Sequence, residues 1–460
     1  MKTLKQILAL TLCVTLVFGI CGCSMLKSGM GEADMGGAIM PPMIGSSGDG
    51  DVFMDSVSPD ASIGSSESET AGSTDSGKSE DTKPEDDTES SRRPAGLITA
   101  GAWDDNKYYA EWEKLFDQAS GETAAGKFAG YTGNKSWSFD HSGRIKVTVG
   151  LNSDENARVA GAKVVAKDTD GKTIFEAVTD ATGVAYLFVG YQSCSLTVTS
   201  GDHTATEYYT AELDPSITVK LDGCAEKKNA MDIMFVVDVT GSMGDELDFL
   251  KGELADVINR VASGSNNASI NLALLFYRDN GDSKKFTYKD FTDVTSPEGL
   301  AAIQSALDKE SADGGGDYPE AVDEALELAV GKQWSSGATT KLIFHVLDAP
   351  PHSNTANIER YNSSVVAAAA KGIRICPILC SGAENLTEYL VRQAAIYTGG
   401  TFIYVTDDSG IGNSHHDPDL PNVTVELLNS LLVRVIKGYH SGEFAPPVYW
   451  KTDKANNQGN

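Results

Sequence analysis

The sequence has little positive charge. Its 37 lysines and arginines stand against 65 aspartates and glutamates, and the formal net charge is −28 at pH 7. An acidic surface repels phosphate backbones and anionic lipid head groups, so we do not expect a nucleic acid as a partner. The same surface suits a protein that stays soluble and gathers divalent cations.

Common catalytic signatures are also missing. The sequence contains no His-Glu-x-x-His and no Gly-x-Ser-x-Gly, and residues 230–440 contain no P-loop. These absences argue against zinc protease, serine hydrolase and ATPase chemistry. A metal-dependent hydrolase without these motifs remains the rival of a binding function.

The N-terminus has the layout of an export signal. Lys2 and Lys5 precede an apolar run, Ile7 to Ile20, which is too short for an ordinary membrane-spanning helix. The run ends in Ile20-Cys21-Gly22-Cys23, which resembles a bacterial lipobox and implies cleavage before Cys23 and a lipid on this residue. Acylation anchors the chain to the bacterial cell membrane or outer membrane through lipid only, and leaves the rest outside the cytoplasm in water.

Two alternatives remain for this segment. Cleavage before Cys21 fits less well, because Ile20 is bulky where the signal peptidase prefers Gly or Ala. An uncleaved anchor helix is disfavoured by the length of the run.

Few cysteines remain for the folded part. Of seven, Cys13 and Cys21 leave with the signal peptide and Cys23 carries the lipid. Cys194 and Cys224 either form a disulfide in the exported protein or stay as thiols, and the sequence does not choose between these. The two others, Cys376 and Cys380, are too far apart on one strand to be bridged.

A polar stretch follows the lipobox. Residues 28 to 96 are rich in Gly, Ser, Thr, Asp, Glu and Pro and poor in aromatic residues. Such a composition cannot bury enough surface to fold, which predicts a disordered tether with a reach on the order of 45 Å.

Aromatic residues gather directly after this tether. The spacing of Tyr109, Trp112 and Phe116, together with Trp103 and Tyr108, predicts a short amphipathic helix. A carbohydrate-stacking platform is one interpretation, but aromatic side chains at this spacing belong more often to a core. We therefore predict no site here.

Residues 144 to 221 have the pattern of short β-strands. Alternating residues such as Ile145, Val147 and Val149 are separated by turn signals at Asp170-Gly171 and Asp180 to Gly183. This pattern predicts an antiparallel β-sandwich of immunoglobulin-like type. Residues 160–189 are similar to prealbumin-like, carboxypeptidase-regulatory sandwich domains, which implies a spacer or a contact surface.

Residues 230 to 440 alternate apolar strands with amphipathic helices, which predicts an α/β domain with a doubly wound, mainly parallel sheet. Met231 to Val237 fits a central strand, and apolar residues from Leu247 to Val261 recur at helical spacing. Further strands are expected at Ile270 to Tyr277, Leu342 to Leu347, Ile373 to Leu379 and Phe402 to Val405. Ligands of such sheets bind beyond the carboxyl ends of the strands.

The sequence thus divides into six predicted parts. They are a signal peptide (1–22), a lipidated disordered tether (23–96), a short helical and aromatic segment (97–140), the sandwich (141–224), the α/β domain (230–440) and a tail (441–460).

Oxygen-bearing side chains follow the first strand of the α/β domain. Asp238, Thr240 and Ser242 lie at alternate positions of a tight loop at a helix start. Their oxygens can converge on one hard cation such as Mg²⁺, which prefers six oxygen ligands and keeps some of them as water. One carboxylate leaves such an ion under-neutralised, so further charge is expected from other strand ends.

Two other segments supply that charge. Asp317 and Glu320 open a helix after three glycines, and Asp348 ends the strand LIFHVLD. Together with Asp238, Thr240 and Ser242, which match D-x-[ST]-x-S, they strongly resemble the metal-ion-dependent adhesion site of von Willebrand factor A domains. The resemblance implies a Rossmann-like fold, a bound Mg²⁺ (or Mn²⁺ or Ca²⁺) and a protein partner whose Asp or Glu completes the coordination.

The second loop departs from the commoner family pattern, because Gly316-Asp317 stands where Gly-Thr is frequent. It looks more like the integrin β-subunit version, in which an Asp-x-Pro-Glu sequence lends its glutamate to the adhesion-site metal and its aspartate to a neighbouring cation. This resemblance implies Glu320 first and Asp317 second. A simple helix cap, or a degenerate site that keeps only the fold, is the alternative.

Other polar residues near the strand ends are weaker candidates. His352 could approach the ion, but imidazole is a soft ligand for Mg²⁺. Arg278 and Asp279 are expected to form an ion pair at the rim. His415-His416 could hold zinc but is expected to be a solvated loop pair.

We therefore predict a surface-anchored, non-enzymatic lipoprotein that binds a protein through a metal ion, in adhesion or complex assembly. A metal-dependent hydrolase and a structural spacer with a degenerate metal site are the alternatives. The lipobox and the absence of a P-loop from residues 230–440 argue against a cytosolic chelatase or ATPase partner.

Overall fold

The structure is a computed structural model that describes residues 93–131, 137, 139–140, 142–211, 215–264 and 267–457. The predicted signal peptide, Cys23 and the tether up to residue 92 lie outside the described residues. No helix in the described ranges is long and apolar enough to cross a membrane.

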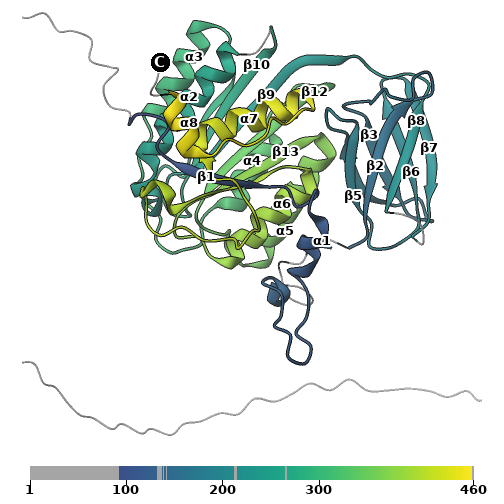
Figure 1. Ribbon diagram of the computed structural model, residues 1–460, viewed down its shortest axis with the longest axis horizontal. Helices are drawn as coiled ribbons and strands as arrows, with labels where there is room; N and C mark the ends of the chain where they lie inside the picture. The colour runs from purple at the N-terminus through teal and green to yellow at the C-terminus, as the bar shows by residue number, and fades with distance from the viewer. Residues whose placement is uncertain are drawn as a thin grey trace, which may run out of the picture. The chain divides into compact units, whose positions relative to one another are not determined.

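An eight-stranded sheet forms the centre of the α/β part (Figure 1), in the order β11-β10-β9-β12-β13-β14-β1-β15. Strands β10, β9, β12, β13 and β14 pair in parallel, whereas β11 and β1 are antiparallel to their neighbours. The predicted α/β class is confirmed, with a mixed sheet whose centre is parallel. The strands are β1 (Thr99–Trp103), β9 (Lys227–Asp238), β10 (Ser269–Tyr277), β11 (Phe286–Asp293), β12 (Ala338–Leu347), β13 (Ile373–Leu379), β14 (Phe402–Val405) and β15 (Glu426–Leu427).

Strand β9 shows why helices cover both faces of the sheet. From Met231 to Asp238 every residue is buried, and side chains point alternately to opposite faces. Ile233 and Phe235 enter one core, while Met234 and Val236 enter the other. The first core includes α2 (Leu247–Ser263), α3 (Pro297–Asp308) and α7 (Leu428–Ser441); the second includes α4 (Val322–Gly331), α5 (Thr355–Lys371) and α6 (Asn385–Thr398).

The segment before the sandwich contributes to this sheet. Strand β1 pairs with β14 and β15, although some 300 residues separate them in the sequence. The predicted short helix is α1 (Tyr109–Lys114), and Trp112 is fully buried against Phe116 and Phe128. The core interpretation of these aromatic residues is therefore confirmed for Trp112.

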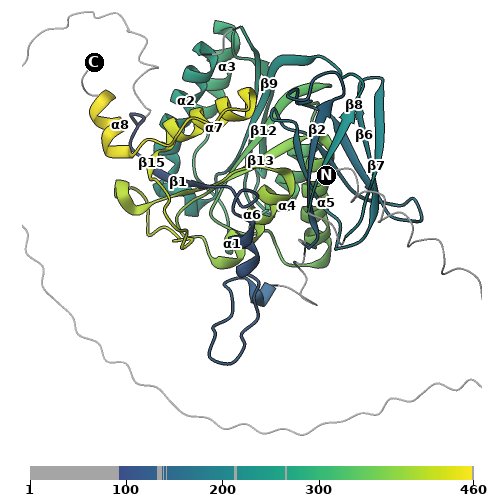
Figure 2. The same cartoon turned by 45° about the vertical axis from the view of Figure 1, so that its right-hand side comes forward.

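Residues 144–221 form two further sheets, of order β5-β2-β8 and β4-β3-β6-β7 (Figure 2). The pairs of the second sheet are antiparallel, but β2 and β8 are parallel, which departs from the predicted all-antiparallel arrangement. The immunoglobulin-like type remains a prediction. The strands are β2 (Arg144–Leu151), β3 (Lys163–Lys167), β4 (Thr173–Val178), β5 (Val184–Phe188), β6 (Cys194–Ser200), β7 (His203–Tyr209) and β8 (Ser216–Leu221).

The two-sheet part packs on helices α5 and α6 of the α/β part. Tyr397 of α6 stacks on Phe188 with ring centroids 4.4 Å apart and meets Phe175 edge-on at 5.4 Å. Arg374 adds a hydrogen bond of 2.8 Å to the carbonyl of Val178. One continuous core therefore joins the two parts.

All four described cysteines are free thiols. Cys194 is buried inside the two-sheet part while Cys224 is exposed, so the disulfide alternative is not realised in this structure.

Candidate metal centre

The topology brings Asp238 and Asp348 to one edge of the sheet. Asp238 is the last residue of β9, and Asp348 directly follows β12, its parallel neighbour. From β9 the chain passes to β10 on one side and later to β12 on the other. Such a switch in strand order opens a crevice beyond the carboxyl ends of the strands, where ligands bind in sheets of this kind.

The loop after β9 turns its oxygens toward one another. Asp238 Oδ1 accepts hydrogen bonds from the Thr240 backbone N–H at 2.9 Å and from the Thr240 hydroxyl at 2.7 Å. The Thr240 and Ser242 hydroxyl oxygens are 3.1 Å apart. Asp238 and Thr240 are fully buried whereas Ser242 is exposed. Neither Thr240 nor Glu246 caps the following helical turns with its side chain, so this loop is more than a helix cap.

Backbone hydrogen bonds hold the second and third loops against the first. The Gly241 N–H donates to the carbonyl of Gly314 and the Glu320 N–H to that of Pro350, both at 3.0 Å. Gly315 has φ +73°, and a Cβ there would lie 3.0 Å from Glu320 Oε1 and 3.2 Å from Thr240 Cβ. The glycine run thus lets Glu320 approach the first loop.

Three buried carboxylates meet at this edge. Asp238, Glu320 and Asp348 are each at most 3% exposed. Burial, followed by the charge of Asp348, raises the pKa of Asp238 to about 7. Burial and then the charges of Asp238 and other nearby aspartates raise the pKa of Glu320 to about 9. The surroundings of the site solvate this negative charge poorly, so binding of a proton or a cation is favourable.

Two carboxylate oxygens have no ordinary hydrogen bond. Asp238 Oδ2, beside the Tyr277 hydroxyl, and Glu320 Oε2 are buried and accept none of normal geometry from the described residues. Unsatisfied acceptors of this kind fit a hard cation, which prefers oxygen ligands. Within the described ranges, however, no three His, Cys, Asp or Glu side chains form a cluster that could hold a metal by themselves. Hydroxyl and water ligands are thus needed to complete such a site.

The sequence-predicted residues differ in their placement. Asp238, Thr240, Glu320 and Asp348 are buried at the strand ends. Asp317 is exposed on the loop before Glu320. Of the two carboxylates proposed for the second loop, only Glu320 is buried close enough to the other carboxylates for their charges to raise its pKa.

Asp282, which follows β10, was not singled out from the sequence, and Asp279 was assigned only to an ion pair at the rim. Asp282 Oδ2 accepts hydrogen bonds from the backbone N–H groups of Gly315 and Asp279, and so fixes the glycine loop. Asp279 is buried and lies 2.7 Å from His352 Nε2. The expected pairing of Arg278 with Asp279 is wrong, because Arg278 pairs with Glu310. Asp279 and Asp282 follow a strand of the same sheet, and this position was the signal by which the sequence could have indicated them.

Residues 232–405 match the von Willebrand factor A domain family. The match runs from β9 to the last residue of β14, so it contains the five parallel strands and the carboxylates of the site. The two-sheet part, β1 and α7 lie outside the matched residues.

Individual proteins are similar over smaller shares of their length. The chain is 27% identical over 225 residues to an ariadne-like RING finger protein of Acanthamoeba polyphaga mimivirus, covering 45% of this chain and 21% of that protein. Two structures of the pilus adhesin SpaC from Lactobacillus rhamnosus GG have TM-scores of 0.34 and 0.33 at 11% and 13% identity, and cover 63% and 62% of this chain. Proximal thread matrix protein 1 from the mussel byssus has a TM-score of 0.28 at 18% identity, covering 36% of this chain and 40% of that one.

The chain spans about a fifth of the mimivirus protein and about a third of SpaC. Structural similarity at these TM-scores supports no argument about function.

His415 and His416 are not the solvated pair that the sequence suggested. His415 Nε2 lies 2.7 Å from Glu246 Oε1 and its Nδ1 lies 2.8 Å from Asp407. Glu246 Oε1 also accepts the N–H of Ser381, so the histidine ties the loop after β14 to the start of α2. Hydrogen bonds and charge from the two carboxylates outweigh burial and raise the pKa of His415. No zinc ligand set involves these histidines among the described residues.

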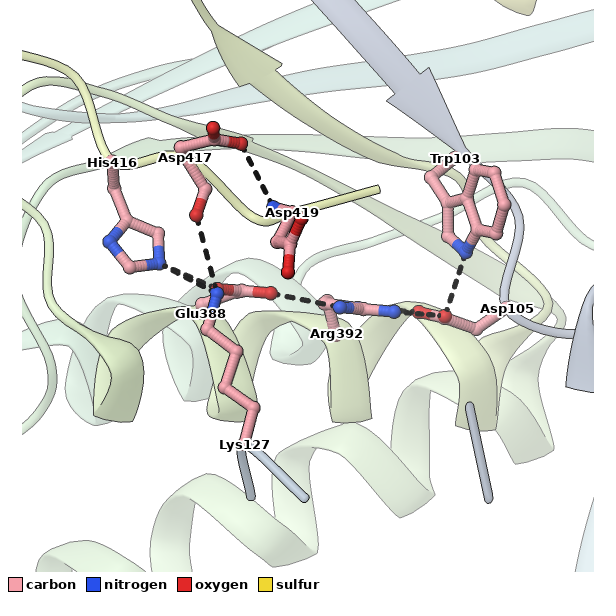
Figure 3. Close-up of polar contacts among 8 residues, drawn as sticks. All are labelled: Trp103, Asp105, Lys127, Glu388, Arg392, His416, Asp417 and Asp419. Carbon is pink, nitrogen blue, oxygen red and sulfur yellow. Dashed lines mark hydrogen bonds and ion pairs between the residues drawn. The ribbon is translucent and has the colours of Figure 1, made fainter. Parts of the chain in front are cut away.

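His416 joins a buried ion-pair network on α6 (Figure 3). Its Nε2 lies 2.6 Å from Glu388 Oε2, which Lys127 Nζ also approaches at 2.6 Å. Arg392 connects the other Glu388 oxygen, at 2.8 Å, to Asp105 at 2.5 Å. Arg392, Glu388 and Asp105 are nearly inaccessible to solvent. The network fastens the segment before the two-sheet part to the von Willebrand factor A domain.

Proposed function

We propose that this chain is a surface-anchored lipoprotein that binds a protein partner through a divalent cation at the ends of β9 and β12. The observation that carries the proposal is the convergence of three buried carboxylates from three loops, two of which have an oxygen without an ordinary hydrogen bond. A von Willebrand factor A domain is consistent with a binding role rather than catalysis.

In this proposal Asp238, Thr240 and Ser242 face the cation, and Glu320 and Asp348 supply the remaining charge. Asp317, which is exposed, is left to a neighbouring position or to solvent. Mg²⁺ is the first choice because every candidate ligand is an oxygen, with Mn²⁺ or Ca²⁺ as alternatives. Exposure of Ser242 leaves one side open, where a partner's Asp or Glu would reach the ion.

The proposed location is the outer side of the cell membrane or the outer membrane, with the lipid on Cys23. Mass spectrometry of the mature N-terminus tests this part separately. A diacylated Cys23 supports the anchor, and an unmodified Cys23 or a lipid on Cys21 contradicts it.

The binding function is tested by capture from a cell-surface or host-matrix extract, with and without EDTA. The immobilised chain should retain a partner in Mg²⁺, lose it in EDTA and regain it when Mg²⁺ is restored. Asp238→Ala should capture nothing, whereas the control Asp248→Ala, which removes a mostly exposed carboxylate on α2, should behave as wild type. Capture that persists equally in EDTA and in Asp238→Ala would overturn the proposal.

A further inference from the structure

A cavity lies between the two-sheet part and the von Willebrand factor A domain. Its volume is about 230 Å³, several times the roughly 30 Å³ of a water molecule in the liquid. Val178 to Ala181 line it on one side, and Thr339 to Lys341 at the start of β12 line the other. Asp348 lies at the far end of β12, about 25 Å away at the rise of a strand. The cavity is therefore separate from the candidate metal centre.

The charge of this cavity is opposite to that of the molecule. Four basic side chains line it, Lys227, Lys341, Lys371 and Arg374, against the single carboxylate of Asp180. The whole chain, by contrast, carries a formal charge of −28. Positive charge gathered at one hollow of an acidic protein attracts anions to that place.

The four basic groups bind carbonyls rather than carboxylates. Lys341 Nζ donates to the carbonyl of Lys371 at 3.1 Å, and Lys371 Nζ donates to that of Val330 at 2.8 Å. Arg374 likewise donates to the carbonyl of Val178 at 2.8 Å, and Lys227 Nζ to that of His440 at 2.6 Å. Within the described residues, none of the four has a carboxylate within 4.0 Å. Carbonyl dipoles orient these cations without neutralising them.

The one acidic side chain is occupied by its own turn. Asp180 Oδ1 accepts hydrogen bonds from the N–H and hydroxyl of Thr182 and from the N–H of Val184, at 2.6–3.0 Å. On the other wall the Thr339 hydroxyl is buried and makes no hydrogen bond to the described residues. The wall beside the cations therefore contains a hydroxyl group without a partner among the described residues.

The lysines repel one another in this setting. Burial lowers the pKa of Lys341, and the nearby charges of Lys371 and Lys228 lower it further, against the opposite effect of Asp232. Burial also lowers the pKa of Lys227. A bound anion would relieve both effects.

We propose that this cavity binds a tetrahedral oxyanion of the phosphate class, either free phosphate or the phosphate group of a small ester. Ammonium, guanidinium and hydroxyl donors are the groups that proteins use for such anions. The multiple charge of phosphate matches several cations better than a single carboxylate does. The volume leaves room for a small organic substituent.

The test is calorimetric titration of the full mature chain in Mg²⁺-free buffer, with chloride keeping the ionic strength constant. Inorganic phosphate and glycerol 3-phosphate are titrated separately, and saturable 1:1 binding of either supports the proposal. Tighter binding of one of them identifies the source. If neither phosphate compound gives saturable heat, or if chloride alone gives an equal response, the proposal is overturned.

Variants test the location of the site. Lys341→Gln should weaken phosphate binding about tenfold, and the control Lys163→Gln, at an exposed pair with Glu176, should leave it unchanged. Asp180→Asn keeps the oxygen that its turn requires and should tighten binding about threefold. If Lys341→Gln does not fold, Asp180→Asn decides, and wild-type affinity in that variant contradicts the proposed site.

Discussion

Asp238 and Glu320 owe their chemistry to burial. A carboxylate that is withdrawn from water beside other carboxylates has a raised pKa, and it keeps its charge only if a cation accompanies it. The structure places Thr240 and Ser242 hydroxyls next to this charge. A cation bound there, as we propose, would let these carboxylates keep their charge.

One substitution at each position distinguishes the roles of Glu320 and Asp317 in metal binding. Glu320→Gln removes a buried negative charge beside Asp238, and we expect Mg²⁺ affinity to fall about tenfold or more. Asp317→Asn changes an exposed side chain and should alter affinity by less than about threefold. Calorimetric titration measures both. A larger loss in Asp317→Asn would reverse the assignment of the two carboxylates.

His345 makes folding sensitive to acid. It is fully buried on β12, its Nε2 has no hydrogen bond to the described residues, and burial lowers its pKa to about 3. In the unfolded chain its pKa is near 6.5, so below that pH the unfolded state binds a proton that the folded state excludes. The stability from neutral His345 is thus present above pH 6.5 and is lost as pH falls toward 3.

His345→Phe should remove this dependence. Between pH 4 and 6 the slope of unfolding free energy against pH should decrease by about 1.4 kcal/mol per pH unit relative to wild type. Urea denaturation at a series of pH values measures the slope. An unchanged slope would mean that His345 is not the buried neutral group that the structure indicates.

At the scale of elements, continuous apolar runs were the most reliable guide. Ile373 to Leu379 was predicted as a strand and is β13 to the residue, because a strand buried on both faces is mostly apolar, and Arg374 is its one charged residue. Strand β1, Thr99–Trp103, could not be predicted, since its small residues show no alternation and its partners lie 300 residues away. Strand β11 was not predicted, because it is half-exposed and has no continuous apolar face.

The residues of the site likewise divide into those that the sequence could predict and those that it could not. Asp238 and Asp348 were predictable because they directly follow such runs. The contribution of Asp282 was not, since it depends on a loop conformation that brings it to Gly315. Nor did the sequence indicate that His415 would bind Glu246, directly before α2, and that His416 would bind Glu388 on α6.

The buried network on α6 predicts a large effect of one substitution. Arg392→Met leaves Asp105 and Glu388 buried without their shared cation, and removing one partner of a buried pair costs about 3–5 kcal/mol of stability. The control Lys114→Met, in an exposed pair with Glu111, should cost less than about 1 kcal/mol. Urea denaturation compares the two. Equal losses would show that the network does not stabilise the fold.

At the scale of the molecule, the described part of the chain shares one packed core across the two-sheet part and the α/β part. The Gly96, Leu97 and Ile98 N–H groups donate to Glu253, so residues at the predicted end of the tether bind to α2. Packing of this extent restricts access of a protease to the backbone.

Limited trypsin digestion should therefore cut first near Lys78, Lys83, Arg92 and Arg93, and leave a fragment that starts close to residue 97. The fragment should retain both the two-sheet part and the von Willebrand factor A domain. Mass spectrometry of early products checks this. Early cleavage within 144–221 would contradict the shared core.

The proposed function requires that Asp238 binds a divalent cation. Calorimetric titration of Mg²⁺ and Mn²⁺ into wild type and Asp238→Ala measures this binding. Circular dichroism serves as the control for folding, and Asp248→Ala as the control for charge. We predict saturable binding in wild type and in Asp248→Ala, and an affinity at least about a hundredfold weaker in a folded Asp238→Ala, because the neutral Thr240 and Ser242 hydroxyls cannot alone offset dehydration of the ion. Wild-type affinity in a folded Asp238→Ala would contradict the assignment of Asp238 as a ligand of the cation.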